Sequence, residues 1–143
     1  MIETNTQKES PMKFVCLGYH NEGKYASTPE AEGFAMMDEC LTYDDELREK
    51  GHFADGHALQ GANTAATLRW QDGKVIVTDG PYAETKEQIG GILILDAQDF
   101  NHAIQLMSKH PAIRFGTYFE IRPAADLTEM IRESEKRRSL AKG

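Results

Sequence analysis

A run of four consecutive aliphatic residues, Ile92 to Leu95 in the segment GGILILD, constrains the fold more than any other feature. Successive side chains of a strand point to opposite faces, so a continuously apolar strand must contact protein on both faces. Residues 12–19, MKFVCLGY, also carry β-type residues at both alternating positions. These two segments predict central strands of a sheet that is apolar on its front and its back.

Two helices are predicted between the strands. The first begins after Thr28, read as its N-cap, because Pro29 suits the first helical position, and it ends before Gly51. The second is capped by Asp99 and ends near Pro111. The first helix has an apolar stripe that is expected to face the core, formed by Phe34, Met37, Leu41 and, approximately, Leu47.

A hairpin and two further strands complete the predicted elements. Residues 65–70 and 74–78 flank the dipeptide Asp72-Gly73, the strongest short-range hairpin signal. Residues 52–61 are expected to form a short irregular strand, and residues 115–121 alternate as a final strand. The hairpin has one apolar face, made by Leu68, Trp70, Val75 and Val77.

This order matches the ferredoxin-like βαββαβ pattern, an α+β fold with an antiparallel sheet and two helices on one face. Two helices cover one face only, and a large uncovered apolar face is rarely left in water. The simplest cover is the same surface of a second copy related by two-fold symmetry. We therefore expect a homodimer whose two sheets pack against each other.

Composition sets the domain organisation and excludes some partners. The 143 residues, 40% of them apolar, suit one domain over residues 12–123, with a flexible polar leader at 1–11 and a charged helical tail at 124–143. A net charge of −7 disfavours nucleic acid as a partner. The sequence has no run of about 18 apolar residues and no signal-like leader, so we expect no membrane contact and a cytoplasmic location.

The cysteines and histidines favour neither a disulfide framework nor a metal site. Cys16 and Cys40 are expected to be buried, reduced thiols, since neither belongs to a CxxC pair. The five histidines lack the spacing of a zinc site. No nucleotide-binding glycine pattern occurs either, and we expect neither a metal nor a cofactor.

The segment VTDGPYAETKEQIGGILILD, residues 77–96, resembles the signature of the YCII-related family, in the branch named for its DGPF motif. Tyr82 stands where that branch usually has Phe. The resemblance implies a dimeric ferredoxin-like α/β barrel. In the wider superfamily it implies lyases, isomerases and oxygenases, with a His–Asp acid–base pair in the YCII branch. DGPF-type proteins are also similar to those encoded beside extracytoplasmic-function sigma factors.

The DGPY loop supplies the first candidate site residues. Asp79 either fixes the turn before Gly80 through backbone hydrogen bonds or serves as a carboxylate in a cleft. Glu84 and Lys86 either line a polar ligand site, cap a turn or pair in solvent. Tyr82, with Tyr19 and Trp70, either forms an aromatic wall for a flat substrate or packs in the core or the dimer interface. Gly90 permits close approach of a neighbouring strand or of a ligand.

Asp55 and His57 are the second candidate pair. They are two residues apart, so in a strand their side chains share a face, and an imidazole exchanges protons near neutral pH. One hypothesis is a cofactor-independent lyase or isomerase in which Asp79 and His57 transfer protons. Its alternative is a non-catalytic dimer that binds a small ligand, or a protein partner in sigma-factor signalling.

Overall fold

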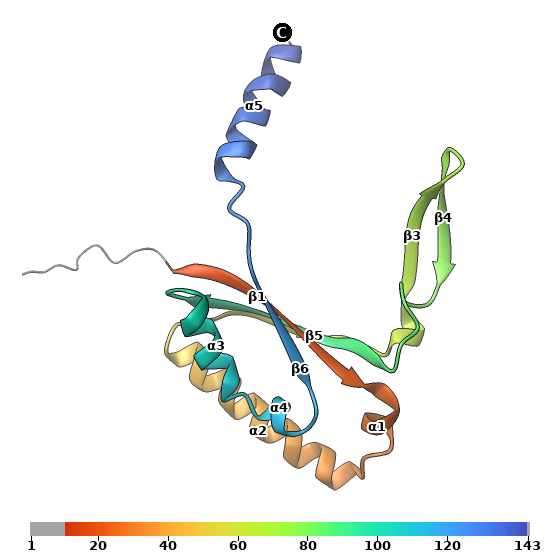
Figure 1. Ribbon diagram of the computed structural model, residues 1–143, viewed down its shortest axis with the longest axis vertical. Coiled ribbons are helices and arrows are strands. Elements are labelled where there is room, and N and C mark those ends of the chain that lie inside the picture. Colours follow the sequence, from red (N-terminus) through yellow and green to blue (C-terminus); the bar gives the residue numbers. More distant parts are fainter. Residues whose placement is uncertain (1–10, 143) are drawn as a thin grey trace, which may run out of the picture.

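The protein is described here by a computed structural model of residues 11–142. Four strands form one antiparallel sheet in the order β2-β5-β1-β6, and β3 pairs with β4 in a separate hairpin (Figure 1). Residues 1–10 of the predicted leader lie outside the described residues. In chain order the elements are β1 Met12–Asn21, α1 Glu22–Ala26, α2 Glu30–Glu49, β2 Phe53–Ala58, η2 Ala62–Thr64, β3 Ala66–Gln71, β4 Lys74–Asp79, β5 Glu87–Ala97, α3 Phe100–Ser108, α4 Pro111–Arg114, β6 Tyr118–Pro123 and α5 Thr128–Lys142.

The two strands that are apolar on both faces occupy the centre of the sheet, as predicted. β5 pairs with β2 on one side and with β1 on the other, and β1 also pairs with β6. In this register Val15 lies opposite Ile94 and Leu17 lies opposite Ile92. The fold is therefore α+β with an antiparallel sheet, which is compatible with the ferredoxin-like prediction.

The hydrophobic core lies on one face of the sheet, under α2 and α3 (Figure 1). The Tyr43 hydroxyl of α2 donates a hydrogen bond to the Leu106 carbonyl of α3, which ties the two helices together. Asp99 caps α3 as predicted, since its carboxylate accepts from the His102 N–H at 2.8 Å. The buried apolar residues are Phe14, Cys16, Leu47, Leu93, Leu95, Ala97, Ala103 and Met107.

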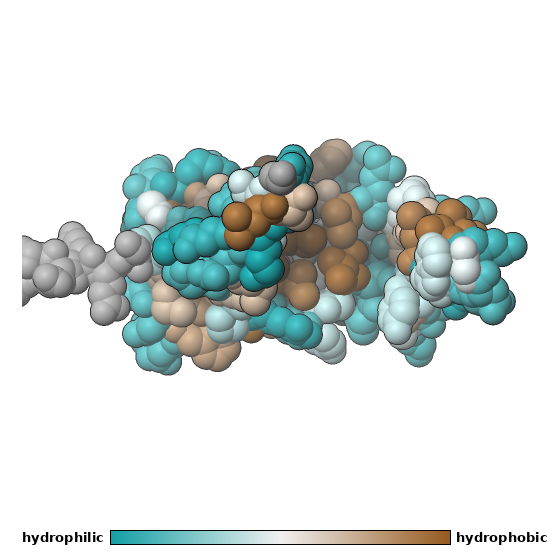
Figure 2. Space-filling view, turned by 90° about the horizontal axis from the view of Figure 1, so that it is seen from above, coloured by the Kyte–Doolittle hydropathy of each residue, from teal (hydrophilic) through white to brown (hydrophobic). Residues whose placement is uncertain are grey.

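The other face of the sheet carries the second set of alternating residues, and we call it the open face. Val15 and Leu17 of β1 lie beside Ile92 and Ile94 of β5, and all four are half-buried. A view onto this side shows apolar side chains between α5 and the β3–β4 hairpin (Figure 2). Both of those elements rise from the sheet on the side away from α2 and α3 (Figure 1). The centre of the open face is therefore apolar, as the sequence predicts.

The predicted hairpin is confirmed, but it stands apart from the main sheet as an arm. Its turn residues Asp72 and Gly73 both have positive φ, 51° and 79°. Within the described residues the arm strands pair only with each other, and the sheet takes Phe53–Ala58 as its edge strand beside β5. The apolar arm residues Leu68, Trp70, Val75 and Val77 are consequently exposed, Trp70 by 71%.

Two expectations for the first helix are wrong. Phe34, Met37 and Leu41 of the expected stripe are exposed, whereas its fourth member, Leu47, is buried in the core, and Tyr43 packs against that core. A second stripe lies one step around the same helix, so periodicity alone does not tell which stripe is buried. Thr28 does not cap α2 either. Its hydroxyl donates to the Lys24 carbonyl of α1, a short helix that the sequence analysis did not predict, and Pro29 occupies the N-cap position.

The predicted helical tail is present as α5. It rises away from the sheet, and its apolar residues Met130 and Ile131 are exposed (Figure 1). Asp126 accepts hydrogen bonds from the N–H and hydroxyl of Thr128 at the start of the helix. Within residues 11–142, no helix is long and apolar enough to cross a membrane.

Candidate functional site

A cleft of about 530 Å³ lies at the foot of the arm. Its walls are the segment 59–65, the loop 81–89 and Tyr19 at the end of β1. The side chain of Tyr19 belongs to the open face, because it alternates with the buried residues of β1. The cleft therefore adjoins the open face of the sheet.

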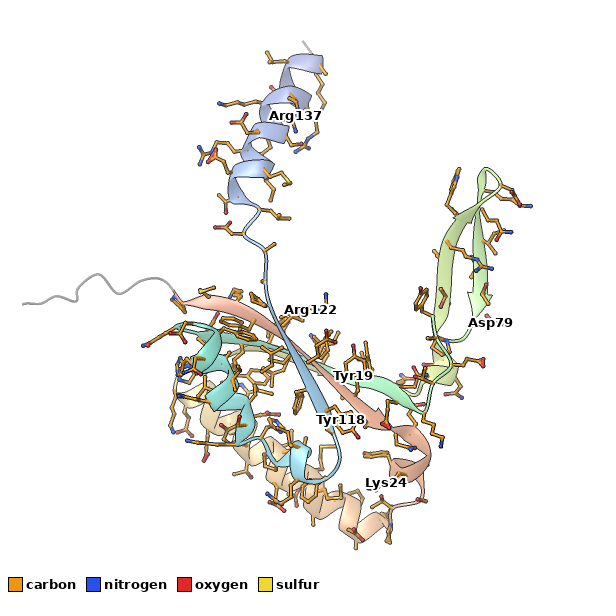
Figure 3. The ribbon with its side chains drawn as sticks, in the orientation of Figure 1. Tyr19, Lys24, Asp79, Tyr118, Arg122 and Arg137 are labelled. Carbon is orange, nitrogen blue, oxygen red and sulfur yellow. The ribbon has the colours of Figure 1, made fainter. Side chains whose placement is uncertain are left out.

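Asp79 ends β4 at the foot of the arm (Figure 3). Two other contacts hold the turn that follows: the Gly80 N–H donates to the Ala65 carbonyl at 2.7 Å, and the Thr67 hydroxyl donates to the Gly80 carbonyl at 2.9 Å. Among residues 11–142, no hydrogen bond or ion pair engages the Asp79 carboxylate. Among the described residues, Thr67 and the Gly80 N–H hold this turn, and not the carboxylate of Asp79.

Asp55 and His57 do share a face. In the register of β2 with β5, Asp55 lies opposite Ile94 and His57 lies opposite Ile92, so both belong to the open face. Their side chains approach to 3.3 Å between Oδ1 and Nε2 and are 64% and 72% exposed. In the described part of the chain, neither residue is joined to Asp79 by a hydrogen bond or ion pair. The structure brings His57 to Asp55 and not to Asp79.

The remaining loop candidates line two neighbouring clefts. Tyr82 borders the cleft at the foot of the arm and is 93% exposed. Glu84 and Lys86 line a second cleft, of about 540 Å³, together with Gly80 and Glu22. The loop between the two clefts is held by Gln88. Its side-chain amide donates to the Ala83 and Thr85 carbonyls at 2.9 and 3.0 Å.

The residue that approaches Gly90 most closely is His20, through its side chain. A Cβ built on Gly90 would stand 2.0 Å from His20 Cε1, far inside contact distance. The other side of the His20 ring stacks on Tyr25, with ring centroids 5.5 Å apart and planes inclined by 17°. The missing side chain of Gly90 is therefore what makes room for this imidazole.

A polar network on β1 and β6 was not predicted. The Tyr19 hydroxyl donates to Glu120 Oε1 at 3.0 Å, and Arg122 Nε donates to Glu120 Oε2 at 2.9 Å (Figure 3). These bonds, first that of Arg122 and then that of Tyr19, lower the pKa of Glu120. The bond to Glu120 is also the main cause of a raised pKa for Tyr19. The alternation of Tyr118, Glu120 and Arg122 with apolar neighbours was the signal that these side chains share a face.

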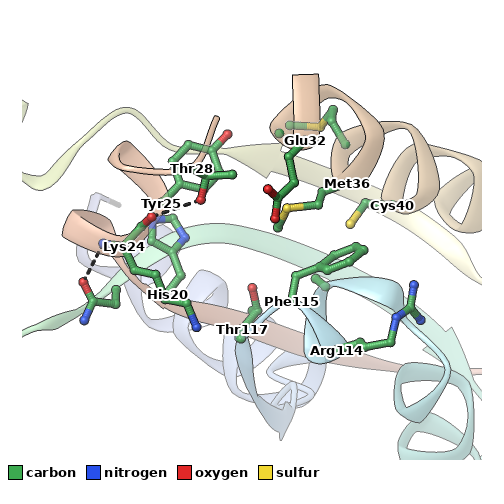
Figure 4. Close-up of a pocket in the computed structure, with 15 residues that line it drawn as sticks. His20, Lys24, Tyr25, Thr28, Glu32, Met36, Cys40, Arg114, Phe115 and Thr117 are labelled. Carbon is green, nitrogen blue, oxygen red and sulfur yellow. Dashed lines mark hydrogen bonds between the residues drawn. The ribbon is translucent and has the colours of Figure 1, made fainter. Parts of the chain in front are cut away.

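A third cavity, of about 350 Å³, lies on the helix-covered side of the molecule (Figure 4). It is lined by the end of β1, by α1, by the first half of α2 and by the turn from α4 to β6. Cys40 lies on its wall and is half-buried, not buried as expected. Cys16 is buried in the core, and this burial raises the pKa of its thiol to about 12. Neither cysteine forms a disulfide.

In the described residues, no group of three or more His, Cys, Asp or Glu side chains is placed to hold a metal ion. The features that could form a site are therefore the open face, the arm and the clefts around the DGPY loop.

The chain matches the YCII-related domain over residues 12–124, from the first residue of β1 to the residue after β6. The chain belongs to the YCII-related family.

The chain is also similar in sequence to another protein. The chain is 31% identical over 118 residues to an uncharacterized protein of Rhizobium meliloti (strain 1021), across 80% of this chain and 93% of that protein. The YCII-related match includes the arm and the DGPY loop, while α5 lies beyond it. The arm is therefore part of the family domain in this chain.

Proposed function

We propose that this YCII-related protein is a homodimer that binds a small polar or aromatic molecule in the cleft at the foot of the arm. The open faces of two copies would pack together as a dimeric α/β barrel, as the DGPF-like loop sequence leads us to expect. The observation that carries the proposal is the apolar row on the open face, Val15, Leu17, Ile92 and Ile94.

The elements beside the open face support a second copy as its cover. The arm and α5 rise on the same side of the sheet, and both carry exposed apolar residues, Trp70 and Met130 among them. Exposed apolar surface gathered on one side of a molecule marks an interaction site. A two-fold axis would cover all three features at once, because each copy supplies the same surface to the other.

Charges at the two edges of the sheet favour a particular pairing. Asp55 lies on the open face of edge strand β2, and Arg122 lies on the open face of edge strand β6. If β2 of one copy adjoins β6 of its partner, these opposite charges meet at each seam of the barrel. Pairing β2 with β2 would bring two Asp55 carboxylates together, which costs free energy.

The cleft would gain its missing wall from the partner. Its volume, about 530 Å³, falls within the range of small-molecule sites, roughly 300–1,000 Å³. Tyr19 and Tyr82 supply aromatic surface, and the free carboxylate of Asp79 lies at the foot of the same arm. Glu84 and Lys86 line the neighbouring cleft of about 540 Å³ and would orient a polar ligand that extends into it, whereas Gly90 lies against His20.

One contact favours a catalytic form of this function. Asp55 Oδ1 lies 3.3 Å from His57 Nε2, and a hydrogen bond formed across this short gap would hold the imidazole in one tautomer for proton transfer. A cofactor-independent lyase or isomerase would need such a pair. If the protein retains a bound metabolite on isolation, His57→Gln should leave that binding intact and stop its conversion, as followed by mass spectrometry.

Sedimentation of a matched pair of variants tests the dimer. Leu17→Glu places a charge on the open face, and Leu41→Glu makes the same change on the exposed side of α2. Micromolar wild type and Leu41→Glu should sediment as dimers, and Leu17→Glu as a folded 16.0 kDa monomer. A monomeric wild type, or a Leu17→Glu variant that stays dimeric, would disprove the proposal. Circular dichroism verifies that each variant is folded.

A further inference from the structure

The cavity on the helix-covered side offers a second site, away from the open face and the arm. It is lined by residues of β1, α1, α2 and the α4–β6 turn, none of them on the open face of the central strands. We propose that this cavity binds a small aromatic monocarboxylate, with its ring between His20–Tyr25 and Phe115 and its carboxylate on Lys24. This inference does not depend on the proposed dimer.

One wall of the cavity is held rigidly from behind. The His20 imidazole lies against the Gly90 backbone, where a Cβ would stand 2.0 Å from it, and stacks on Tyr25 on its other side. In the described residues, His20 makes no hydrogen bond through either ring nitrogen. Nδ1 is among the ring atoms packed closest to Gly90, so Nε2 is the better placed of the two nitrogens to bond a ligand.

The opposite wall is apolar. Figure 4 shows Met36, Cys40 and Phe115 across the cavity from His20 and Tyr25. Met36 and Phe115 are half-buried, so their apolar side chains are partly packed against the protein along this wall. Aromatic faces and methionine sulfur both pack favourably on a flat ring. At about 350 Å³ the cavity is at the small end of ligand sites, which suits a ligand of one ring.

The charges at the rim would orient a ligand that carries one anionic group, because Lys24 and Glu32 lie on opposite sides of the cavity (Figure 4). Lys24 lines the cavity and forms no ion pair with any described residue. Arg114, the other basic residue in the lining, is engaged by Glu39 of α2. One free ammonium group suits one carboxylate, since a charge-assisted hydrogen bond is about twice as strong as a neutral one. Glu32 on the far rim would accept a hydrogen bond from a ring hydroxyl.

Gly33 supports the view that the space is kept open. It lies inside α2 and lines the cavity, yet a Cβ built on it would meet no atom within 4 Å. Glycine in a helix interior costs about 1 kcal/mol relative to alanine. Neither helix stability nor crowding therefore explains this glycine, whereas room at the cavity does.

The test is calorimetric titration of the full chain with 4-hydroxybenzoate, and with 4-hydroxybenzamide as the uncharged control. Saturable binding of the acid, roughly tenfold weaker binding of the amide and a similar loss in Lys24→Met are expected, as for one charged hydrogen bond. Gly33→Leu should abolish binding by filling the cavity. Lys109→Met, which removes an exposed charge outside the lining, should bind like wild type.

The location of the probe is read by amide NMR shifts. They should centre on residues 112–117 and on His20, and they should persist in monomeric Leu17→Glu, which separates this site from the dimer cleft. No binding at millimolar acid, equal binding of acid and amide, or unchanged binding in Gly33→Leu would each overturn the proposal. Shifts centred on Tyr19 and Tyr82 would overturn it as well. If Lys24→Met fails to fold, Gly33→Leu decides.

Discussion

The two faces of the sheet carry the same kinds of residues, but these residues differ in how deeply they are buried. On the covered face, Phe14, Cys16 and Leu95 are fully buried by α2 and α3. On the open face, Val15, Leu17 and Ile94 alternate with them along the same strands and are only half-buried. Both faces are therefore apolar, and among residues 11–142 helices cover one of them (Figure 1); in the proposed dimer a second copy would cover the other.

The sharpest test compares adjacent residues of β5. Leu95→Ala removes a fully buried side chain from the covered face, so it should lower the free energy of unfolding by about 2–5 kcal/mol. Ile94→Ala on the open face should cost about 1 kcal/mol in the protomer. Urea unfolding at two protein concentrations measures both. If Ile94→Ala were as costly as Leu95→Ala at every concentration, the chain's own residues would be covering the open face.

A pair of glycines tests crowding on the helix side. Gly90→Ala must displace the His20 ring, and we expect a loss of about 1–3 kcal/mol in the free energy of unfolding. Gly33→Ala enters open space in α2 and should stabilise by about 0.5–1 kcal/mol. Thermal and urea unfolding give both values. A neutral Gly90→Ala would mean that the His20 ring is not held where the structure places it.

Two helix caps compare the covered side with the open side. Asp99 caps α3, which covers the core, and Asp126 bonds Thr128 at the start of α5, which rises from the open side. Asp99→Ala should lower the free energy of unfolding by about 1 kcal/mol. Asp126→Ala should change it by less than about 0.5 kcal/mol, because α5 is not part of the core. Equal losses would place α5 in the same cooperative unit as α3.

The smallest effect concerns the pH dependence of the polar network. The pKa of Glu120 is lowered in the fold, so its contribution to stability is present above the ordinary glutamate pKa, about 4.3, and is lost as the pH falls through the lowered value. Glu120→Gln should therefore destabilise slightly at pH 7 and not at pH 2. Urea unfolding at both pH values measures the difference. A loss independent of pH would assign Glu120 a packing role.

The same network predicts an alkaline counterpart. The pKa of Tyr19 is raised, mainly by its bond to Glu120, so that contribution is complete below the ordinary tyrosine pKa and is lost as the pH rises through the raised value. Because both groups are only half-buried and remain in contact with solvent, the effect should be small. In Glu120→Gln the phenol of Tyr19 should ionise at a lower pH than in wild type, as ultraviolet titration would record.

Local patterns in the sequence predicted most of the elements. The Asp72-Gly73 turn, the Asp99 cap and the helix stop at Gly51 depend on neighbours within a few residues, and all three are present. Patterns that require a choice between faces were less informative. Phe34 and Met37 share a stripe that the packing of α2 leaves exposed, because a neighbouring stripe reaches the core.

The candidate sites show the same division. The spacing of Asp55 and His57 predicted their shared face, since alternation is a local property of a strand. The proximity of Glu120 to Tyr19, 101 residues apart in the chain, could not be predicted in this way. The cavity lined by Lys24, Gly33 and Phe115 was missed for the same reason, because four separate elements form it.

The sequence by itself determined that β1 and β5 would be central and apolar on both faces, because strand alternation fixes which side chains share a face. Only the tertiary structure decided that the hairpin stands off the sheet as an arm and that Phe53–Ala58 takes its place at the edge. It also decided that Gly90 makes room for His20. These outcomes depend on contacts between distant segments, whose free energies no local pattern encodes.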